Sequence, residues 1–574
     1  MFSLISRIRM YGRKRQSPIV IGPAPAGKDR NGNIVLSKHI SLLTDGHVSN
    51  ANMNVAVFGN SANNAVSYVG PNIMQANGSL VVLDPDGDIH DTYAEYLKNK
   101  GYTVKKLDLV HMDQSDRYNP FYYVSSNEDI EDLVQAVINN TPRGGKESFS
   151  FTKKYVDIAL LAAVFLYVYY YANEDDRNLA FAADLLNEEA EYLNLHDAAG
   201  NDSIRDMHES DSSPLDEIFA FVRYEDPDSL AVKQYKTFKM ATGYYSYRKE
   251  VVESCARRLD IFATEETDEL MWTDGMDIDQ IGNERTAVFV IVPKCDNAFN
   301  PIAAMFFTQF FKLVHDYCEN TAKYTQVVTD GEGNVVRYFK ADAESEAGRR
   351  AEAEAFLAEA KNGKVCRNEA AGRYEVISSS GELICFRGSE KDAEKALELI
   401  KGGKVIDKAS RPNAGMTLPV RTAVIFAGMP NGCKIQNFDM ITATAHRYNL
   451  SISIVIESLM RLQALYNEHM DWMDIMGNCD SVVMSGGGCD GFTAKWVSKA
   501  INRTLHSSGS KMKPSLLVKR ITRPGDYSYE ALWRLPADKC IVFVQNKTAL
   551  IDEKCNESFH PEWPIAVRCR NRAR

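Results

Sequence analysis

The sequence lacks the patterns that mark secreted, zinc-binding and membrane-spanning proteins. Its 11 cysteines are scattered and odd in number, without a C-x-x-C pair, which is typical of reduced thiols rather than a disulfide framework or a zinc site. No H-E-x-x-H pattern occurs, and no signal peptide with a small-residue cleavage site is recognisable. The longest apolar run, Ile158 to Ala172, is shorter than the about 20 residues that cross a bilayer, so it predicts a buried helix.

A general excess of basic residues is also absent, because 66 Lys and Arg stand against 77 Asp and Glu. Proteins that coat nucleic acid need many basic residues on one face, so this charge argues against that class but leaves room for a local basic groove. The N-terminus mixes apolar and basic residues. It is either a frayed basic tail or a weak attachment to an anionic membrane surface or to nucleic acid. Its basic residues are Arg7, Arg9, Arg13, Lys14 and Arg15.

What the 574 residues do contain is alternation of short β-branched runs with helical stretches, in a length that predicts two to four domains. The alternation begins at Asn54 and is interrupted after the run YTVKKLDLV. It resumes at TAVFVIV (Thr286 to Val292) and continues through RTAVIFAG, SISIVIES, CDSVVMSGG and KCIVFVQ. This order predicts an α/β protein with a parallel sheet and helices on both faces.

Two blocks interrupt the alternation. Residues 147–269 have helical periodicity and no strand signals, which predicts an inserted all-helical domain. Residues 323–417 contain an internal repeat, in which GNVVRYF, a helix and NGKVCRN are echoed by GELICFR, a helix and GGKVIDK. Each copy predicts a strand, a charged helix and a strand. We interpret this block as a small α+β insertion that is either decoration or a docking site for another protein.

Several segments resemble the TraG/TraD-type coupling proteins of conjugative type IV secretion, especially those of Gram-positive mobile elements. They include GPNIMQANGSLVVLDPDGDI, LDLVHMDQSDRYNPFYYV, AVKQYKTFKMATG, TAVFVIVPKCDNAFN, YNLSISIVIESLMRLQALY, GNCDSVVMSGG and LWRLPADKCIVFVQNKTALIDEK. They occur in the family's order and cover most of residues 50–320 and 418–563. The resemblance implies a RecA-like (P-loop NTPase-type) ATPase domain, an inserted all-helical domain, and a hexameric ring that feeds DNA or relaxase–DNA substrates to a secretion channel.

The resemblance and the patterns together predict six segments. They are an N-terminal tail and hairpin (1–50), the first part of the RecA-like domain (51–145), the all-α domain (146–275), a continuation of the RecA-like domain (276–322), the α+β insertion (323–417) and the C-terminal part of the RecA-like domain (418–574). Family members usually carry an N-terminal membrane anchor, whereas this chain begins almost directly before its α/β domain. We therefore expect it in the cytoplasm, or attached peripherally at the inner face of the cell membrane.

The first family motif is altered at the residues that hold phosphate and magnesium. In G-x-x-x-x-G-K-[ST], backbone N–H groups wrap the phosphates, the lysine neutralises their charge and the hydroxyl binds Mg²⁺. The matching residues are Gly59, Asn60, Ser61, Ala62, Asn63, Asn64, Ala65 and Val66. Only the first glycine remains, since Asn64 replaces the second, Ala65 the lysine and Val66 the hydroxyl residue.

The second motif has lost both of its carboxylates. The family's strand ends in Asp-Glu, which orients Mg²⁺ and the attacking water, and the matching strand ends in Ala427-Gly428. A glutamine that senses the γ-phosphate falls on Glu457, where a carboxylate repels phosphate unless it is paired or protonated. The family's Asp-Pro-Lys-Gly-Glu turn is Asp84-Pro85-Asp86-Gly87-Asp88, with an acidic residue in place of lysine.

One further loop, Gly22 to Asp29, nearly has the P-loop spacing. Asp29 stands where Ser or Thr belongs, and two prolines remove N–H donors from the loop, so we interpret it as an ordinary loop.

Three functions follow from these residues. The first is a pseudo-ATPase that binds neither ATP nor Mg²⁺ and scaffolds other coupling-protein subunits, a relaxase or the secretion channel, as a homo- or hetero-oligomer. The second is an active DNA-translocating ATPase, with ATP and Mg²⁺, that uses asparagine and serine donors at residues 60–64 and the carboxylates of residues 84–88. The third is a DNA-binding module without ATPase activity. Its candidate contacts are Lys233, Lys236, Lys239, Arg257 and Arg258, which are otherwise a solvated helical face.

Overall fold

The computed structural model describes most of the chain. The described residues are 19–21, 33–42, 44, 53–142, 151–198, 212–294, 296–329, 335–340, 346–368, 373–380, 383–387, 390–407, 417–429, 433–507, 518–544 and 548–573. The basic N-terminal residues and the loop from Gly22 to Asp29 lie outside these ranges, so their predicted roles stay predictions.

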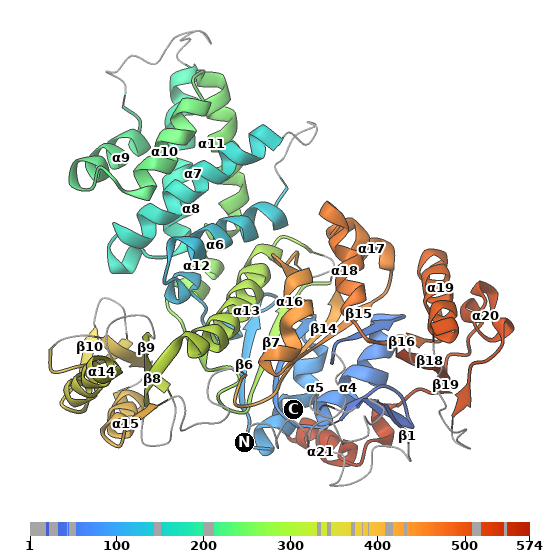
Figure 1. Ribbon diagram of the computed structural model, residues 1–574. Helices are drawn as coiled ribbons and strands as arrows, with labels where there is room; N and C mark the ends of the chain where they lie inside the picture. Colours follow the sequence, from blue (N-terminus) through green and yellow to red (C-terminus); the bar gives the residue numbers. More distant parts are fainter. Residues whose placement is uncertain are drawn as a thin grey trace.

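A ten-stranded sheet forms the centre of the molecule (Figure 1). Its strand order is β17-β19-β18-β16-β4-β15-β14-β5-β7-β6. The strands are β4 (Val55–Phe58), β5 (Ser79–Pro85), β6 (Thr103–Asp108), β7 (Thr286–Val292), β14 (Thr422–Met429), β15 (Leu450–Ile456), β16 (Ser481–Ser485), β17 (Lys519–Arg520), β18 (Lys539–Val544) and β19 (Thr548–Glu553). The seven from β16 to β6 are parallel, as predicted, whereas β18, β19 and β17 form an antiparallel edge that the alternation did not reveal.

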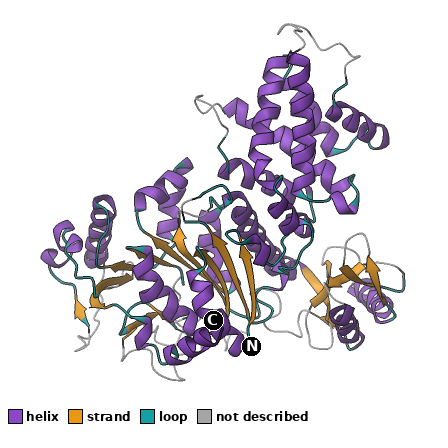
Figure 2. Ribbon diagram, turned by 180° about the vertical axis from the view of Figure 1, so that it is seen from behind, coloured by secondary structure: helices purple, strands orange, loops and turns teal. Residues whose placement is uncertain are grey.

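The sheet is covered by helices on both faces (Figure 2), because its central strands are apolar on both sides. Along β5, Leu80 and Val82 face one core cluster and Val81 and Leu83 face the other. The helices on the first face are α4 (Gly70–Met74), α5 (Asp88–Asn99) and α21 (Trp563–Ala573). Those on the second are α13 (Asn300–Lys323), α16 (Phe438–Thr444) and α19 (Gly491–Ser507). This arrangement confirms the predicted α/β class, with helices on both faces of a mostly parallel sheet.

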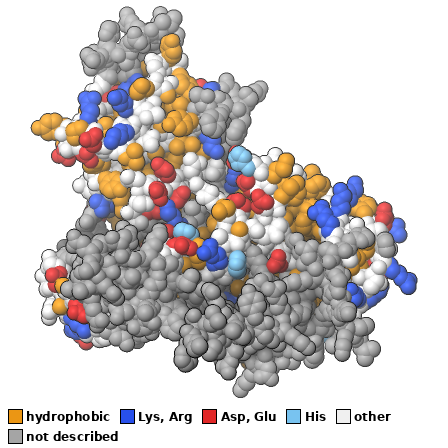
Figure 3. Space-filling model, viewed as in Figure 1, with side chains coloured by type: hydrophobic (Ala, Val, Ile, Leu, Met, Phe, Trp, Pro, Cys, Tyr) orange, Lys and Arg blue, Asp and Glu red, His pale blue; other side chains and the backbone are white. Residues whose placement is uncertain are grey.

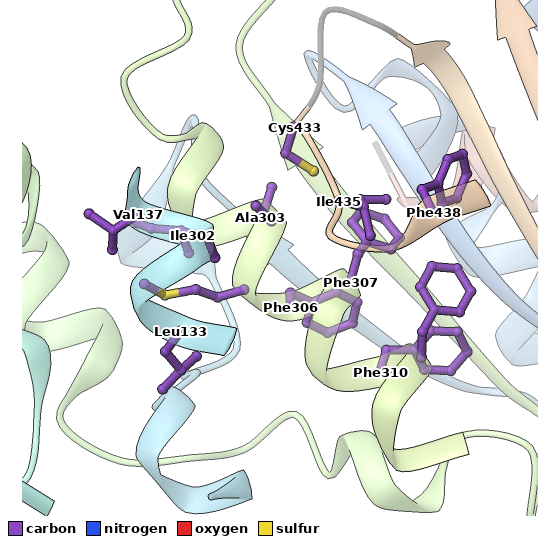
Figure 4. Packing of buried hydrophobic residues seen from close by; sticks show 14 of the residues in the cluster. Leu133, Val137, Ile302, Ala303, Phe306, Phe307, Phe310, Cys433, Ile435 and Phe438 are labelled. Atoms are coloured by element: carbon purple, nitrogen blue, oxygen red, sulfur yellow. The ribbon is translucent and has the colours of Figure 1, made fainter. Parts of the chain in front are cut away.

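Between β6 and β7 the described residues form helices and no strand. They are α6 (Asn127–Asn140), α7 (Phe151–Tyr170), α8 (Leu179–Ala198), α9 (Pro214–Glu225), α10 (Leu230–Ala241), α11 (Tyr245–Leu259) and α12 (Glu265–Met271), with short 3₁₀ turns between α7 and α8 and between α11 and α12. The run from Ile158 is the interior of α7, where Ala163 and Phe165 are fully buried. Figure 4 shows Leu133 and Val137 of α6 beside Ile302 and Phe306 of α13, a contact that ties this helical unit to the sheet. Within the described ranges, no helix combines the length and the apolar character required to cross a bilayer.

The insertion forms two three-stranded antiparallel sheets with a small core of its own. Its elements are β8 (Tyr324–Thr329), β9 (Val335–Lys340), α14 (Glu346–Lys361), β10 (Lys364–Asn368), β11 (Arg373–Ile377), β12 (Leu383–Arg387), α15 (Glu390–Lys401) and β13 (Lys404–Asp407). The internal repeat predicted a strand, a helix and a strand in each copy. The structure adds one strand before each copy, β8 before the first and β11 before the second, so each repeat is a hairpin, a helix and a strand. The last strands are exchanged: β10 pairs with β11 of the second repeat, and β13 pairs with β8 of the first.

Candidate functional site: a closed nucleotide loop

The sheet brings the altered motif residues to one edge. Phe58, the last residue of β4, pairs with Ile456 of β15 and with Met484 of β16. On the other side, β15 is followed by β14 and β5. Because parallel strands end at the same edge, the segments after β4, β5, β14 and β15 meet there, where α/β proteins of this kind bind their ligands. The four segments that the sequence analysis assigned to one site therefore lie at one edge of the sheet, and their role there stays a prediction.

The loop after β4 is too short to wrap a phosphate. Gly59 has φ of 133°, and the helix α3 (Ser61–Asn64) begins two residues later and continues through the π turn η2 (Ala65–Val69) into α4. Asn60 caps this helix, since its side chain accepts from Asn63 N at 3.1 Å and its carbonyl accepts from Asn64 N at 3.0 Å. The N–H groups of Asn63 and Asn64 are therefore used inside the helix.

Asn64 fills the space that the second glycine of a P-loop leaves open. Its side chain is fully buried, and Ser485 Oγ donates to its Oδ1 at 2.6 Å. The surroundings are tight, because a Cβ on Gly59 would lie 2.9 Å from Ser485 Cβ. Val66, in the hydroxyl position, is 37% exposed and offers no magnesium ligand. Ser485 lies 421 residues from Asn64, and no sequence signal marked it.

Glu457 places a carboxylate against the start of this helix. Ser61 N donates to Glu457 Oε1 at 3.0 Å, and Arg461 Nη1 lies 3.8 Å from Oε2. Backbone N–H groups at a helix start attract anions. The Glu457 carboxylate therefore accepts from the Ser61 N–H, which would otherwise face a phosphate. Arg461 pairs with this carboxylate, and pairing was one of the two conditions that the sequence analysis set for a carboxylate at this position.

The end of β14 has no room for the missing carboxylates. Ala427 is buried in the apolar layer beneath the edge. A Cβ on Gly428 would lie 2.6 Å from Pro85 Cγ, inside the closest contact that real Cβ atoms make. A strand this close to its neighbour cannot carry Asp or Glu at that position without moving.

The acidic turn after β5 is occupied by the protein's own groups. Asp84 is fully buried and accepts from His90 N at 2.7 Å and Ile89 N at 3.3 Å, and burial raises its pKa to about 7. Asp86 accepts from Lys294 N at 2.9 Å, and Lys294 Nζ lies 3.1 Å from its Oδ2. The neighbouring carboxylates raise the pKa of Lys294 although its partial burial opposes this. Lys294 is a further residue that the sequence did not single out.

These residues do not fit ATP with Mg²⁺. The N–H groups of Ser61, Asn63 and Asn64 are bonded within the protein, Asn64 and Glu457 lie beside them, and the position of Gly428 is too close to Pro85 for a carboxylate. Within the described parts of the chain, no group of three or more His, Cys, Asp or Glu side chains is arranged to hold a metal ion.

The candidate DNA contacts lie on α10 and α11, and several are engaged inside the helical unit. Lys239 Nζ lies 2.6 Å from Asp216 Oδ1. Arg258 is buried and donates to Thr141 O at 2.6 Å, close to Asp157. Lys233 donates to the carbonyl of Asp228 at 2.6 Å, and Arg257 lies 3.8 Å from Glu253. Lys236 is exposed. Burial removes Arg258 from any DNA surface, which its place in the sequence did not reveal.

Two family models match parts of this chain. Residues 22–329 match the family model for type IV secretory system conjugative DNA transfer, and residues 428–518 match the model for the TraM recognition site of TraD and TraG. The first match alone covers more than half of the chain. The chain therefore belongs to the family of conjugative DNA-transfer proteins of type IV secretion, and it is a coupling-protein-like component of that process.

Solved structures similar to this chain are remote in sequence. The conjugative coupling protein TrwB, in its unbound monoclinic form, has 10% identity over 94% of each chain with a TM-score of 0.49. TrwB in complex with the GTP analogue GDPNP has the same identity and coverage with a TM-score of 0.48. VirB4 of Thermoanaerobacter pseudethanolicus has 8% identity over 93% of this chain and 98% of its own, with a TM-score of 0.39. No curated protein matches this chain.

Proposed function

We propose that this chain is a pseudo-ATPase of conjugative DNA transfer, a coupling-protein-like subunit that binds or scaffolds partners without hydrolysing ATP. The observation that carries the proposal is the helix that begins at Ser61, with the Glu457 carboxylate against its first N–H at 3.0 Å. A phosphate in that place would meet a like charge instead of a free donor.

The combined losses support the same proposal. Each missing charge-assisted contact to phosphate removes about 1.5–3 kcal/mol of binding free energy. Ala65 supplies no cation, Val66 no magnesium ligand, and Ala427 and Gly428 no carboxylates. One neighbouring side chain can replace one such group, but the cations and carboxylates described at this edge are already engaged with each other or with backbone N–H groups, as Lys294 is with Asp86 and Arg461 with Glu457.

The proposed partners are those of a coupling protein: other coupling-protein subunits, a relaxase or the secretion channel. The description of the second family model names recognition of TraM, and it falls on residues 428–518 of this chain. We propose that this segment takes part in partner recognition. We further propose that the protein works in the cytoplasm or attached peripherally at the inner face of the cell membrane.

Isothermal titration calorimetry of the purified chain with ATP and Mg²⁺ tests the proposal. We expect no heat beyond that of a titration into heat-denatured protein, and no ATP turnover with or without DNA. Micromolar binding would instead support an active ATPase with unusual ligands and would end the pseudo-ATPase proposal.

A further inference from the structure

Exposed apolar side chains lie on and beside the two short helices that follow β15. These are α17 (Leu459–Leu465) and α18 (Asp471–Gly477), which are neighbours in the fold. Figure 3 shows hydrophobic side chains over α17, beside Lys and Arg side chains over α19. We define the methionine patch as Met460, Met470, Met473 and Phe492, which are 57%, 60%, 50% and 38% exposed. Leu459 N donates to Thr493 Oγ1 at 3.0 Å, so the first turns of α17 and α19 lie together.

A basic row runs along α19 next to this patch. We define it as Lys495, Lys499 and Arg503, which recur every four residues and therefore share one helix face. All three are exposed, and Lys495 Nζ also lies 5.7 Å from the ring centroid of Tyr529. The 17-residue helix α19 contains no Asp or Glu although the chain has a net charge of −11. Positive charge is therefore concentrated on this face of α19, although the chain as a whole carries a net negative charge.

We propose that the methionine patch and the basic row form a docking surface for an acidic amphipathic helix of a protein partner. Flexible, polarizable methionines adapt to the apolar face of a helix laid across them. The basic row attracts carboxylates along one flank of that helix and fixes its orientation.

A protein partner is favoured over other occupants because the patch lies within residues 428–518, the segment whose family description names recognition of a partner. The inference rests on the proposed function in one respect only: the chain acts by binding partners. The absence of nucleotide binding plays no part in it.

Two synthetic helical peptides with the same apolar face test the surface, one flanked by glutamates and the other by lysines. Fluorescence anisotropy with the full chain is expected to show binding of the glutamate peptide, weakened by added salt, and no binding of the lysine peptide. Equal binding of both peptides, or of neither, would overturn the proposal.

Three double variants locate the binding. K499E/R503E and M460S/M473S are each expected to weaken the glutamate peptide at least about tenfold, which corresponds to 1.4 kcal/mol. The matched control is K391E/K395E, which changes two exposed lysines four residues apart on α15 of the insertion. All of these side chains are exposed, so unchanged melting temperatures are expected to show that the variants are folded. A loss no greater than that of the control would overturn the proposal.

Two further measurements identify a different occupant. Sedimentation velocity that shows self-association abolished by M460S/M473S would assign the face to a second copy of this chain. Binding of single-stranded DNA that is lost in K499E/R503E but kept in M460S/M473S would make it a nucleic-acid surface. Either result overturns the proposal, and both are independent of the ATP titration.

Discussion

Gly428 illustrates how single positions close the nucleotide edge. It stands where the family has a carboxylate, and the neighbouring strand approaches it so closely that a Cβ would lie 2.6 Å from Pro85 Cγ. Glu457 and Asn64 act in the same way on the other side of the edge, since each places a polar group where the phosphate loop would be. The loss of chemistry and the filling of space therefore occur at the same residues.

Replacing Gly428 with alanine is expected to destabilise the protein. The added methyl group must displace Pro85 or shift β14, and overpacking of this kind costs about 1–3 kcal/mol. Urea unfolding measures the change. The control is Gly477→Ala at the end of α18, where a Cβ meets nothing within 4 Å. Equal unfolding midpoints for the two variants would contradict the close approach of β14 and β5.

The buried carboxyl of Asp84 is expected to make stability depend on pH. Its pKa is about 7 in the folded protein, raised by burial from 3.8, so folding favours the protonated form. The stabilisation is complete below pH of about 4 and is lost as pH rises through about 7, at no more than about 1.4 kcal/mol per pH unit. Burial gives Asp274 a pKa of about 7 as well, so part of the decline belongs to that residue.

Asp84→Asn isolates the first contribution. Since asparagine does not titrate, the fall of stability between pH 5 and pH 8 is expected to be shallower in this variant than in the parent protein. Thermal unfolding at several pH values measures it. Parallel curves for the two proteins would show that Asp84 is not protonated in the fold.

At the scale of elements, the early start of one helix decides the character of the site. A P-loop needs an open turn between strand and helix, whereas here Asn60 caps a helix that begins at Ser61. The motif letters alone predicted the loss of phosphate ligands. They did not predict that the turn itself is gone, because helix initiation depends on the cap and on the carboxylate supplied by Glu457.

Restoring the motif residues is therefore expected not to restore nucleotide binding. The variant Asn64→Gly, Ala65→Lys, Val66→Thr regains the lysine and the hydroxyl, but the helix start, Glu457 and Gly428 remain. Calorimetry is expected to give an affinity for ATP weaker than about 1 mM. Tight binding by this variant would mean that the turn opens readily and that side-chain identity alone had blocked the site.

At the scale of the whole molecule, the insertion is set apart by its packing. Its core residues, among them Val328, Leu357 and Val376, form a cluster separate from the two that line the central sheet. The exchange of β10 and β13 between the repeats binds the two repeats to each other. Tyr448 contacts residues near both ends of the insertion, since its hydroxyl donates to Glu319 Oε1 at 3.1 Å and its carbonyl accepts from Leu418 N at 3.2 Å.

Replacing residues 323–417 with a short Gly–Ser linker is expected to leave the rest of the protein folded. The clusters that line the sheet and the helical unit are separate from the core of the insertion, and Tyr448 contacts residues near both of its ends. Circular dichroism and thermal unfolding measure the outcome, with the main cooperative transition expected to persist. Its loss would show that the insertion is required for the fold.

Much of this architecture follows from local patterns. The β-branched runs, the apolar interior of α7, the repeat of the insertion and the departures from the phosphate motifs were all readable, because periodicity and motif spacing depend on residues near one another in the chain. The antiparallel edge of the sheet and the hairpin strands β8 and β11 were not predicted, because strand direction and pairing depend on distant partners.

The sequence by itself determined that the chain carries the elements of a coupling protein, and it predicted that the residues which hold a triphosphate and its metal in that family are replaced. Only the tertiary structure decided what stands in their place. The contacts of Ser61 with Glu457, of Asn64 with Ser485 and of Asp86 with Lys294 each join residues more than 200 positions apart. Such contacts exist only once the strands have aligned their carboxyl ends, so no local pattern can encode them.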